Sequence, residues 1–369
     1  MNRVQKMMLG ANIPAGISLL ILFLSGCLLS SCSTENVLWN DPDKPAENTP
    51  ANNMGSETTE SMDRYYTSQS TVSDVINDPA FGSFGRLLFP VDRSVSPSMT
   101  LAQVSTSSVY MWYPYIRVEK TVEILNFLHS QAASGVQIFY NIYSPDEIAA
   151  DRSKADTGIF VFKGDVGNPF AITNAGGGFA YVGAMHDSFP HSLELSRAGF
   201  TAFALIYRPD DPYRDLAKAI SFIVDNADAL GVDREDYSLW GGSAGARMAA
   251  TLGNKDYLMQ LTNNPDLPQA AAVIMQYTGY SSASPSDAPT YNCVGSNDGI
   301  ASWRAMQNRL QRLSDMGIST EFHVYEGLGH GFGIGTGTVA EGWIEDAIKF
   351  WRANIHDKES SGIPPIYVD

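Results

Sequence analysis

One stretch, residues 237–252, constrains the fold of this chain more than any other. It reads YSLWGGSAGARMAATL: an apolar and aromatic run typical of a buried strand, two glycines, a serine, and then good helix formers. Ser243 and its flanking Gly241 and Gly245 fit the pattern G-x-S-x-G. A strand, a sharp turn, a serine and a helix together are typical of a nucleophile elbow. Glycines are needed there because side chains would clash with the neighbouring strand and helix.

From residue 135 onward, strand patterns alternate with helix patterns. We expect strands at residues 136–143, 158–163, 170–174, 201–207, 237–240, 271–277, 290–294 and 320–325. Besides the helix after Ser243, we expect helices at residues 188–198, 212–230, 300–316 and 341–353. This alternation predicts an α/β fold with a mostly parallel central sheet and helices on both faces. Ligands of such sheets bind beyond the carboxyl ends of the strands.

We do not expect the first 32 residues to belong to the folded domain. Residues 1–32 have a basic start and an apolar run, followed by small residues that lead to Cys27 and again to Cys32. This order predicts a secretory signal. Small residues before a cysteine resemble the lipobox of bacterial lipoproteins, which makes Cys27 or Cys32 the lipidated residue. An ordinary cleaved signal and a single transmembrane anchor are the alternatives, and all three export the protein.

Two further segments separate this signal from the α/β domain. Residues 33–62 are polar and rich in Ser, Thr, Asn and Pro, which predicts a disordered tether. Residues 63–135 combine short apolar pieces, an aromatic cluster and a helical stripe at 118–133. We interpret them as an N-terminal extension that is either an extra layer or a cap over the pocket. The α/β domain is assigned to residues 136–357 and a C-terminal tail to 358–369.

The composition excludes some partners. Among 369 residues, 24 Lys and Arg stand against 40 Asp and Glu, a formal net charge of −16. A chain this acidic is a poor candidate for binding nucleic acid or for a basic membrane-surface patch. Only Cys293 lies outside the signal, so we expect no disulfide framework and a small buried apolar residue at that position.

A reactive serine needs a base to remove its proton, and histidine is the residue that fits. His330 lies in the loop GLGHGFG, residues 327–333, just after the last predicted strand. Its glycine neighbours allow the imidazole to reach across the sheet edge, so we assign His330 as general base and then general acid. The alternative is a surface-loop histidine. The remaining histidines are less well placed along the chain: His129, His186, His191, His323 and His356.

A carboxylate should orient the imidazole and stabilise its cation. Asp298 follows the predicted strand 290–294 through a short turn, which places it at the same sheet edge. The order Ser, Asp, His along the chain is the one that α/β-hydrolases use. The alternatives are a helix-capping or turn aspartate at this position and Glu326 as the reserve carboxylate.

An oxyanion hole needs backbone N–H groups aimed at the position where negative charge develops. Three consecutive glycines follow the predicted strand 170–174, and we assign the N–H groups of Gly177, Gly178 and Ala244 to the hole. The glycines do not spell a dinucleotide fingerprint, and the chain has no Walker loop, H-E-x-x-H or cysteine pair. We therefore expect no metal and no cofactor. His186 is either a substrate contact or a surface histidine at a helix start.

Together these residues resemble the α/β-hydrolase superfamily over residues 136–355. The resemblance is greatest to its esterase-type members, which include hormone-sensitive-lipase-like enzymes and secreted acetyl-xylan-esterase-like carbohydrate esterases. The family's glycine turn usually reads H-G-G-G, and here Ala175 replaces the histidine, as in some acetyl-xylan-esterase-like members. The matching segments are NAGGGF at 174–179, ALIYR at 204–208, GGSAG at 241–245, ND at 297–298 and GHG at 329–331.

The resemblance implies hydrolysis of carboxylic esters through a covalent acyl-enzyme, although fold and catalytic residues do not set the substrate. Our leading hypothesis is a secreted or surface-tethered serine esterase for short acyl esters. Acetyl and feruloyl groups on plant polysaccharide are candidate substrates, and membrane contact is expected only through the lipid anchor. One alternative is a prolyl-oligopeptidase-type peptidase, for which residues 63–135 are too short to supply a propeller. The other is a catalytically silent binding module.

Overall fold

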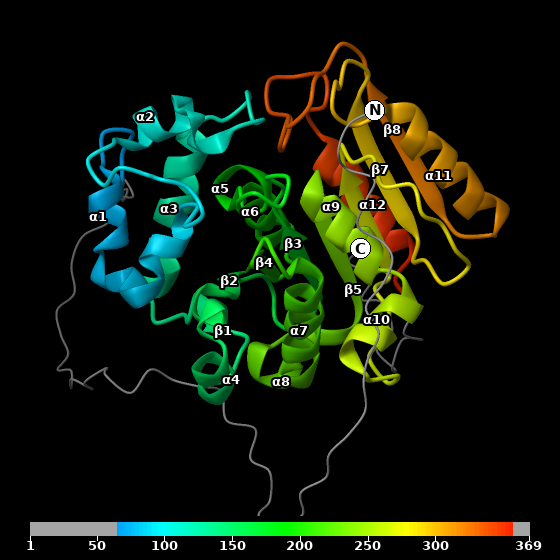
Figure 1. Cartoon of the computed structure of the whole chain (residues 1–369), viewed down its shortest axis with the longest axis horizontal. Helices are drawn as coiled ribbons and strands as arrows, with labels where there is room; N and C mark the ends of the chain where they lie inside the picture. Colours follow the sequence, from blue (N-terminus) through cyan, green and yellow to red (C-terminus); the bar gives the residue numbers. More distant parts are fainter. Residues whose placement is uncertain (1–64, 357–369) are drawn as a thin grey trace, which may run out of the picture. The chain divides into compact units, whose positions relative to one another are not determined.

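A computed structural model describes residues 65–356 (Figure 1). All of these residues belong to one compact unit. The predicted signal with Cys27 and Cys32, the predicted tether and the C-terminal tail lie outside the described residues. Among the helices of residues 65–356, none has the length and apolar character needed to cross a membrane.

An eight-stranded sheet runs through the centre in the order β1-β2-β4-β3-β5-β6-β7-β8. β2 is antiparallel to β1 and β4, and the remaining neighbours are parallel. The predicted α/β fold with a mostly parallel sheet is therefore confirmed. The strands are β1 Phe139–Asn141, β2 Gly158–Phe162, β3 Pro169–Asn174, β4 Ala202–Ile206, β5 Asp233–Gly242, β6 Ala272–Gln276, β7 Thr290–Gly295 and β8 Thr320–Tyr325.

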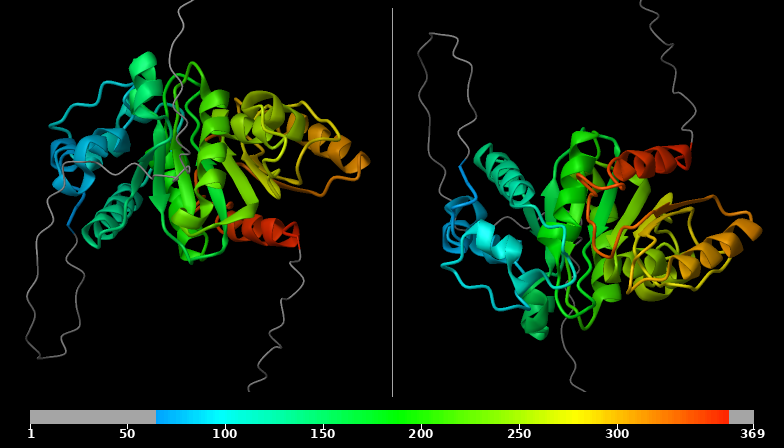
Figure 2. Two further views of the ribbon diagram at one scale, coloured as in Figure 1. Left: turned by 90° about the horizontal axis from the view of Figure 1, so that it is seen from below. Right: turned by 90° about the horizontal axis from the view of Figure 1, so that it is seen from above.

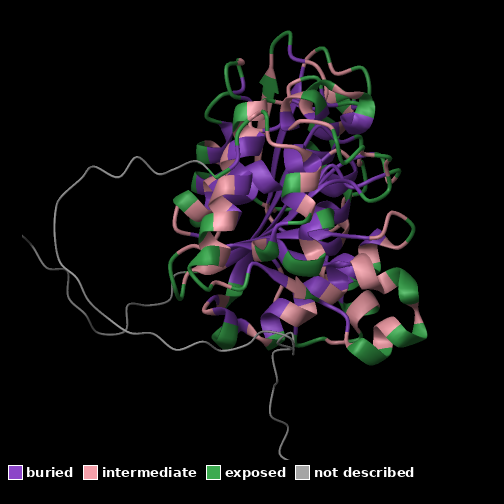
Figure 3. Ribbon diagram, turned by 90° about the vertical axis from the view of Figure 1, so that its left-hand side faces the viewer, coloured by how far each residue is buried: buried purple, intermediate pink, exposed green. Residues whose placement is uncertain are grey.

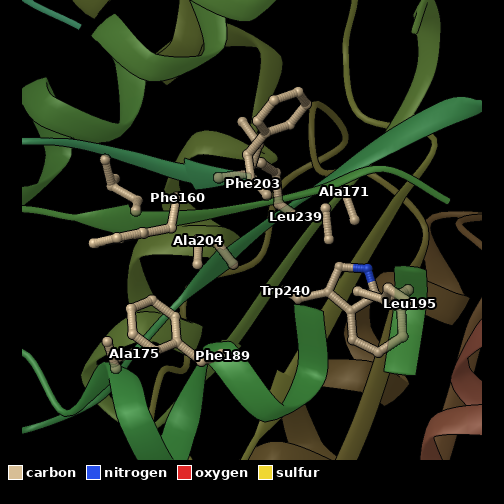
Figure 4. Close-up of a cluster of buried hydrophobic side chains, with 14 of the residues drawn as sticks. Phe160, Ala171, Ala175, Phe189, Leu195, Phe203, Ala204, Leu239 and Trp240 are labelled. Atoms are coloured by element: carbon tan, nitrogen blue, oxygen red, sulfur yellow. The ribbon is translucent and has the colours of Figure 1, made fainter. Parts of the chain in front are cut away.

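The central strands are continuous apolar runs because helices cover both of their faces. Every residue of β2, β4 and β6 is buried, whereas the edge strand β8 has no buried residue (Figure 3). Figure 4 shows part of the core, in which side chains of four strands meet those of one helix: Phe160, Ala171, Phe203, Ala204, Leu239 and Trp240 from the sheet, and Phe189 and Leu195 from α6. The free Cys293 is fully buried in β7, as expected from the sequence.

Right-handed crossovers decide which face each helix covers. The helices that follow β4, β5 and β7 lie on one face, and α6 and α12 lie on the other, where His191 and Trp343 are in ring contact (Figure 2). Those of the α/β domain are α4 Pro145–Ala150, α5 Ala184–Asp187, α6 Phe189–Arg197, α7 Pro212–Asp225, α8 Ala227–Leu230, α9 Ala244–Leu252, α10 Lys255–Thr262, α11 Trp303–Asp315 and α12 Trp343–Ala353.

The N-terminal extension packs against the α6 side of the sheet. Phe84 stacks on Phe139 of β1 at 5.0 Å between ring centroids, and Phe127 stacks on Phe162 of β2 at 5.8 Å. Lys120 also forms an ion pair with Glu194 of α6 at 3.0 Å. The helices of the extension are α1 Val72–Ile76, α2 Leu101–Thr106 and α3 Val118–Ala133, with 3-10 segments η1 Pro79–Leu88 and η2 Ser108–Tyr110; a third, η3 Arg152–Asp156, follows α4.

Several element boundaries differ from the sequence-based expectations, and two of these differences have a clear local cause. The strand expected at 136–143 is limited to Phe139–Asn141, because it is an edge strand that pairs only with β2. The helix expected at 212–230 divides at Asn226, whose side-chain amide donates to the carbonyl oxygen of Phe222 at 2.8 Å. A side chain that bonds a backbone carbonyl within a helix competes with the helical hydrogen bonds, and this favours a break in the helix.

Candidate active site

The turn between β5 and α9 has the geometry of a nucleophile elbow. Ser243 has φ 52° and ψ −115°, a region that residues with side chains rarely occupy. A Cβ at Gly241 would clash with the backbone of Gly245, and one at Gly245 would clash with the carbonyl oxygen of Asn174 in β3. The strand, turn and helix predicted from residues 237–252 are therefore confirmed.

Two loops bring the predicted base and carboxylate to Ser243. The Nε2 atom of His330 lies 3.2 Å from the Ser243 hydroxyl oxygen, and its Nδ1 atom lies 2.7 Å from Asp298 Oδ2. Because an ionised carboxylate only accepts hydrogen bonds, Nδ1 carries the proton and Nε2 is left to accept from the serine. The side chains of Asp298 and His330 are almost completely buried, with 0% and 8% exposed.

Asp298 is itself held by the start of the following loop. Its second oxygen, Oδ1, accepts hydrogen bonds from the backbone N–H groups of Ile300 at 2.8 Å and Ala301 at 2.7 Å. The turn role weighed as an alternative for Asp298 is thus present together with the contact to His330, whereas the helix-capping role is not, because α11 begins only at Trp303 with Ser302 as its N-cap. The Nδ1 atom of the imidazole bonds Asp298 and not Glu326, the reserve carboxylate.

The three glycines after β3 have different environments. Gly176 donates its N–H to the Asp187 carboxylate at 2.7 Å. Within the described part of the chain, the N–H groups of Gly177, Gly178 and Ala244 have no acceptor. Gly177 and Gly178 have φ 125° and 64°, which glycine adopts readily. These three free donors are the ones expected from the sequence, and their role as an oxyanion hole stays a prediction.

Comparisons with known proteins agree with this architecture. The BD-FAE family model matches residues 168–280, which contain the glycine turn and the elbow. An acetyl ester-xyloside bifunctional hydrolase from Caldicellulosiruptor lactoaceticus is similar over 58% of this chain and 95% of its own, at 18% identity and a TM-score of 0.51. An esterase, Est2, from Thermogutta terrifontis is similar over 60% and 94%, at 19% identity and a TM-score of 0.50. No curated protein matches the chain.

The protein has the α/β-hydrolase fold. The segment matched by the family model ends before Asp298 and His330, so the positions of these two side chains rest on the structure of this chain. Ala175, which replaces the histidine usual in this fold's esterase-type glycine turn, is braced differently here. Its carbonyl oxygen accepts a hydrogen bond from the Tyr207 hydroxyl at 2.7 Å.

One buried carboxylate near the elbow was missed by sequence reasoning. Asp187 is 1% exposed and lies beneath the elbow, where a Cβ on Gly242 would clash with it. Besides Gly176 N–H, it accepts hydrogen bonds from the hydroxyls of Tyr113, at 2.9 Å, and Tyr277. Burial raises the pKa of Asp187 to about 6, although the three donors and the charge of His330 oppose the shift.

His186 and His191 are not surface histidines. His186 is 7% exposed, and its Nε2 lies 2.9 Å from the carbonyl oxygen of Gly331, next to His330. His191 Nε2 lies 2.7 Å from the Gln276 side-chain oxygen, and the Gln276 amide donates to the carbonyl oxygen of Gly333 at 2.8 Å. Burial lowers the pKa of both imidazoles to about 4. Both neutral rings therefore help to fix the loop that carries His330.

The alternative of a surface position for His186 is wrong, because helix α5 is covered by the His330 loop and the extension. A role in substrate binding stays a prediction. His186 lines a cavity of about 270 Å³ together with side chains of α3, α6 and the His330 loop, including Lys120, Pro190, Phe332 and Ile334. Ser243 is not among the lining residues.

The extension reaches the site through its aromatic cluster, residues 110–116. A Cβ on Gly331 would clash with the carbonyl oxygen of Trp112 and the ring of Tyr113, and one on Gly178 would lie 3.2 Å from the Trp112 indole. The cluster therefore contacts both the glycine turn and the His330 loop. Within residues 65–356, no group of three or more His, Cys, Asp or Glu side chains is placed to hold a metal ion. The absence of a metal requirement stays a prediction.

Proposed function

We propose that the protein is a serine esterase that hydrolyses carboxylic esters through an acyl-enzyme. The observation that carries this proposal is the chain of contacts from Ser243 to His330 at 3.2 Å and from His330 to Asp298 at 2.7 Å. The α/β-hydrolase fold and the esterases that share it support the proposal without deciding it.

In this reaction His330 Nε2 removes the proton of Ser243 as the serine oxygen attacks the ester carbonyl carbon. Negative charge then develops on the carbonyl oxygen, where the N–H groups of Gly177, Gly178 and Ala244 are available to stabilise it. The imidazolium donates its proton to the departing alcohol, and an acyl group remains on the serine. Water, activated by the same imidazole, releases the acid and restores the serine.

Asp298 has two tasks in this sequence. It holds the imidazole with Nδ1 protonated, and its negative charge stabilises the imidazolium that forms in each half of the reaction. Two backbone N–H groups bond its other oxygen, so the carboxylate is oriented before the substrate arrives. Such preorganisation avoids a reorganisation cost at the moment of proton transfer.

The proposed substrates are short acyl esters, with acetyl or feruloyl groups on carbohydrate as candidates. Support comes from the BD-FAE match and from the acetyl ester-xyloside hydrolase of similar fold. We also propose that the protein is exported and held at the bacterial cell envelope by a lipid on Cys27 or Cys32. The basic, apolar and small-residue order of residues 1–32 supports export.

The test compares wild type with Ser243→Ala, and with Ser221→Ala as the matched serine control on α7, whose hydroxyl only bonds the Ala217 carbonyl. Hydrolysis of p-nitrophenyl acetate and labelling by a fluorophosphonate probe are measured. We expect Ser243→Ala to lose labelling and to lower kcat by roughly 10⁵- to 10⁶-fold, while Ser221→Ala retains both.

Unchanged ester turnover in Ser243→Ala would contradict the proposal. A wild-type protein that the probe does not label, and that hydrolyses no ester, would be the silent binding module. Faster cleavage of an alanyl-prolyl p-nitroanilide than of p-nitrophenyl acetate would favour the peptidase hypothesis instead.

A further inference from the structure

Trp112 occupies an unusual position at the rim of the candidate active site. Two carbon atoms at the far end of its indole lie 3.2 Å from where a Cβ on Gly178 would be, next to a predicted oxyanion donor. Its carbonyl oxygen faces Gly331, the residue after His330. The residue thus lies between the glycine turn and the loop that carries the proposed base.

The backbone of Trp112 is strained. Its φ of 78° lies in the left-handed region, where a bulky side chain is an outlier. Both neighbours anchor the turn, because the Met111 carbonyl oxygen accepts from the Tyr181 hydroxyl and the Tyr113 hydroxyl donates to Asp187. Strain that the surroundings maintain is typical of functional positions, so the orientation of this indole needs an explanation.

The Trp112 ring is stacked on one neighbouring ring, and the residue remains partly exposed. Trp112 stacks on Tyr181 with ring centroids 6.0 Å apart and planes 15° apart, and the Arg93 guanidinium lies 5.3 Å from the Tyr181 centroid. Tyr181 is fully buried, whereas 41% of Trp112 is exposed. Within residues 65–356, Tyr181 is the one ring that stacks on Trp112. The stack therefore ends at a partly exposed residue that a ligand can reach.

We propose that the exposed part of Trp112, beside Gly178, is a binding subsite for a six-membered ring in the substrate. The proposal rests on the proposed ester hydrolysis, because an ester whose carbonyl oxygen accepts from Gly178 N–H has one substituent beside the indole. A pyranose presents C–H groups and an aromatic acyl group presents a π-face, and either ring stacks on an indole. Trp112 would then select ring-bearing esters over small acyclic ones.

The test uses the full chain and three esters: ethyl acetate, an O-acetylated methyl xylopyranoside with the ring on the alcohol side, and ethyl cinnamate with the ring on the acyl side. Trp112→Asn removes the ring, and asparagine tolerates the left-handed backbone. Trp112→Phe keeps a ring. Met111→Ala is the matched control, because Met111 is equally exposed, at 41%, and its side chain is not placed over Gly178.

We expect Trp112→Asn to lower kcat/KM for one ring-bearing ester, relative to that for ethyl acetate, by roughly threefold to tenfold, mainly through KM. Trp112→Phe should retain most of this preference and Met111→Ala all of it. The ester whose relative rate falls identifies the side that carries the ring. Equal losses for all three esters, or an equal loss of preference in Met111→Ala, would overturn the subsite.

Ring binding is also measured apart from hydrolysis, by saturation-transfer NMR with methyl β-xylopyranoside and with cinnamate on the Ser243→Ala protein. We expect contact with one of these rings that disappears when Trp112→Asn is added. Contact that persists, or no contact with either ring, would overturn the subsite whatever the turnover. Ring binding without any ester hydrolysis by the wild type would leave the subsite standing and reject the esterase proposal.

Discussion

Replacing Asp187 with asparagine would remove a buried charge while preserving the shape of the side chain. The amide oxygen can still accept from Gly176 N–H and from the Tyr113 hydroxyl, which share one carboxylate oxygen in the wild type. The amide nitrogen then faces the Tyr277 hydroxyl, whose oxygen can accept in turn. The variant therefore isolates the effect of the charge from the effect of the contacts.

The size and sign of this effect follow from the raised pKa. The pKa of Asp187 is about 6 in the folded protein against an ordinary value of 3.8, a difference of about 2 units. At about 1.4 kcal/mol per unit, this corresponds to about 3 kcal/mol. Because the pKa of Asp187 is higher in the folded than in the unfolded state, the contribution of its carboxyl group to the unfolding free energy is fully present below about pH 4. It is lost as the pH rises through about 6.

Urea unfolding followed by tryptophan fluorescence, at pH values from 4 to 7.5, measures the unfolding free energies of wild type and Asp187→Asn. We expect the free energy of the wild type minus that of the variant to fall by up to about 3 kcal/mol across this range. Asp228→Asn, an exposed change on α8, should show a constant difference from the wild type. A constant difference for Asp187→Asn as well would refute the reasoning.

Two further predictions concern the proposed oxyanion donors and the proposed lipid anchor. Gly177→Ala should lower kcat for p-nitrophenyl acetate by roughly 10²- to 10³-fold, because a Cβ there clashes with the Tyr181 carbonyl and displaces the turn. The control is Gly167→Ala, at φ 85° with no clash, and equal activity of the two variants would contradict the prediction. Either Cys27→Ser or Cys32→Ser should move the protein from the detergent phase to the aqueous phase on expression in a bacterial host, and retention of both in the detergent phase would reject lipidation at these cysteines.

The features that local sequence determines were predictable. The elbow is a short run in which the strand pattern, the glycines around Ser243 and the helix formers all agree. Asp298 and His330 were predictable because each follows a strand, and parallel strands bring their carboxyl ends to one edge. Their distances from the serine side chain needed the structure, since no local pattern fixes how two loops fold toward each other.

Features that depend on distant segments were not predictable. Asp187 binds donors from the extension, the glycine turn and the residue after β6, and a search of the sequence for acids between the serine and the histidine could not reach it. His186 reads as polar and helix-initial, but loops from 145 residues further along bury it. Trp112 belongs to an aromatic cluster in which the order of exposed and buried residues follows no regular period.

The contact between Tyr113 and Asp187 has a consequence for where the functional unit of this protein begins. A chain cut back to residue 136 would still contain every residue drawn in the proposed reaction, yet the carboxylate below the elbow would lose one of its donors, and Gly331 its covering ring. The sequence pattern thus suggests a domain boundary at residue 135, but the packing continues across it. Residues upstream of position 136 complete the packing beneath the Ser243 turn.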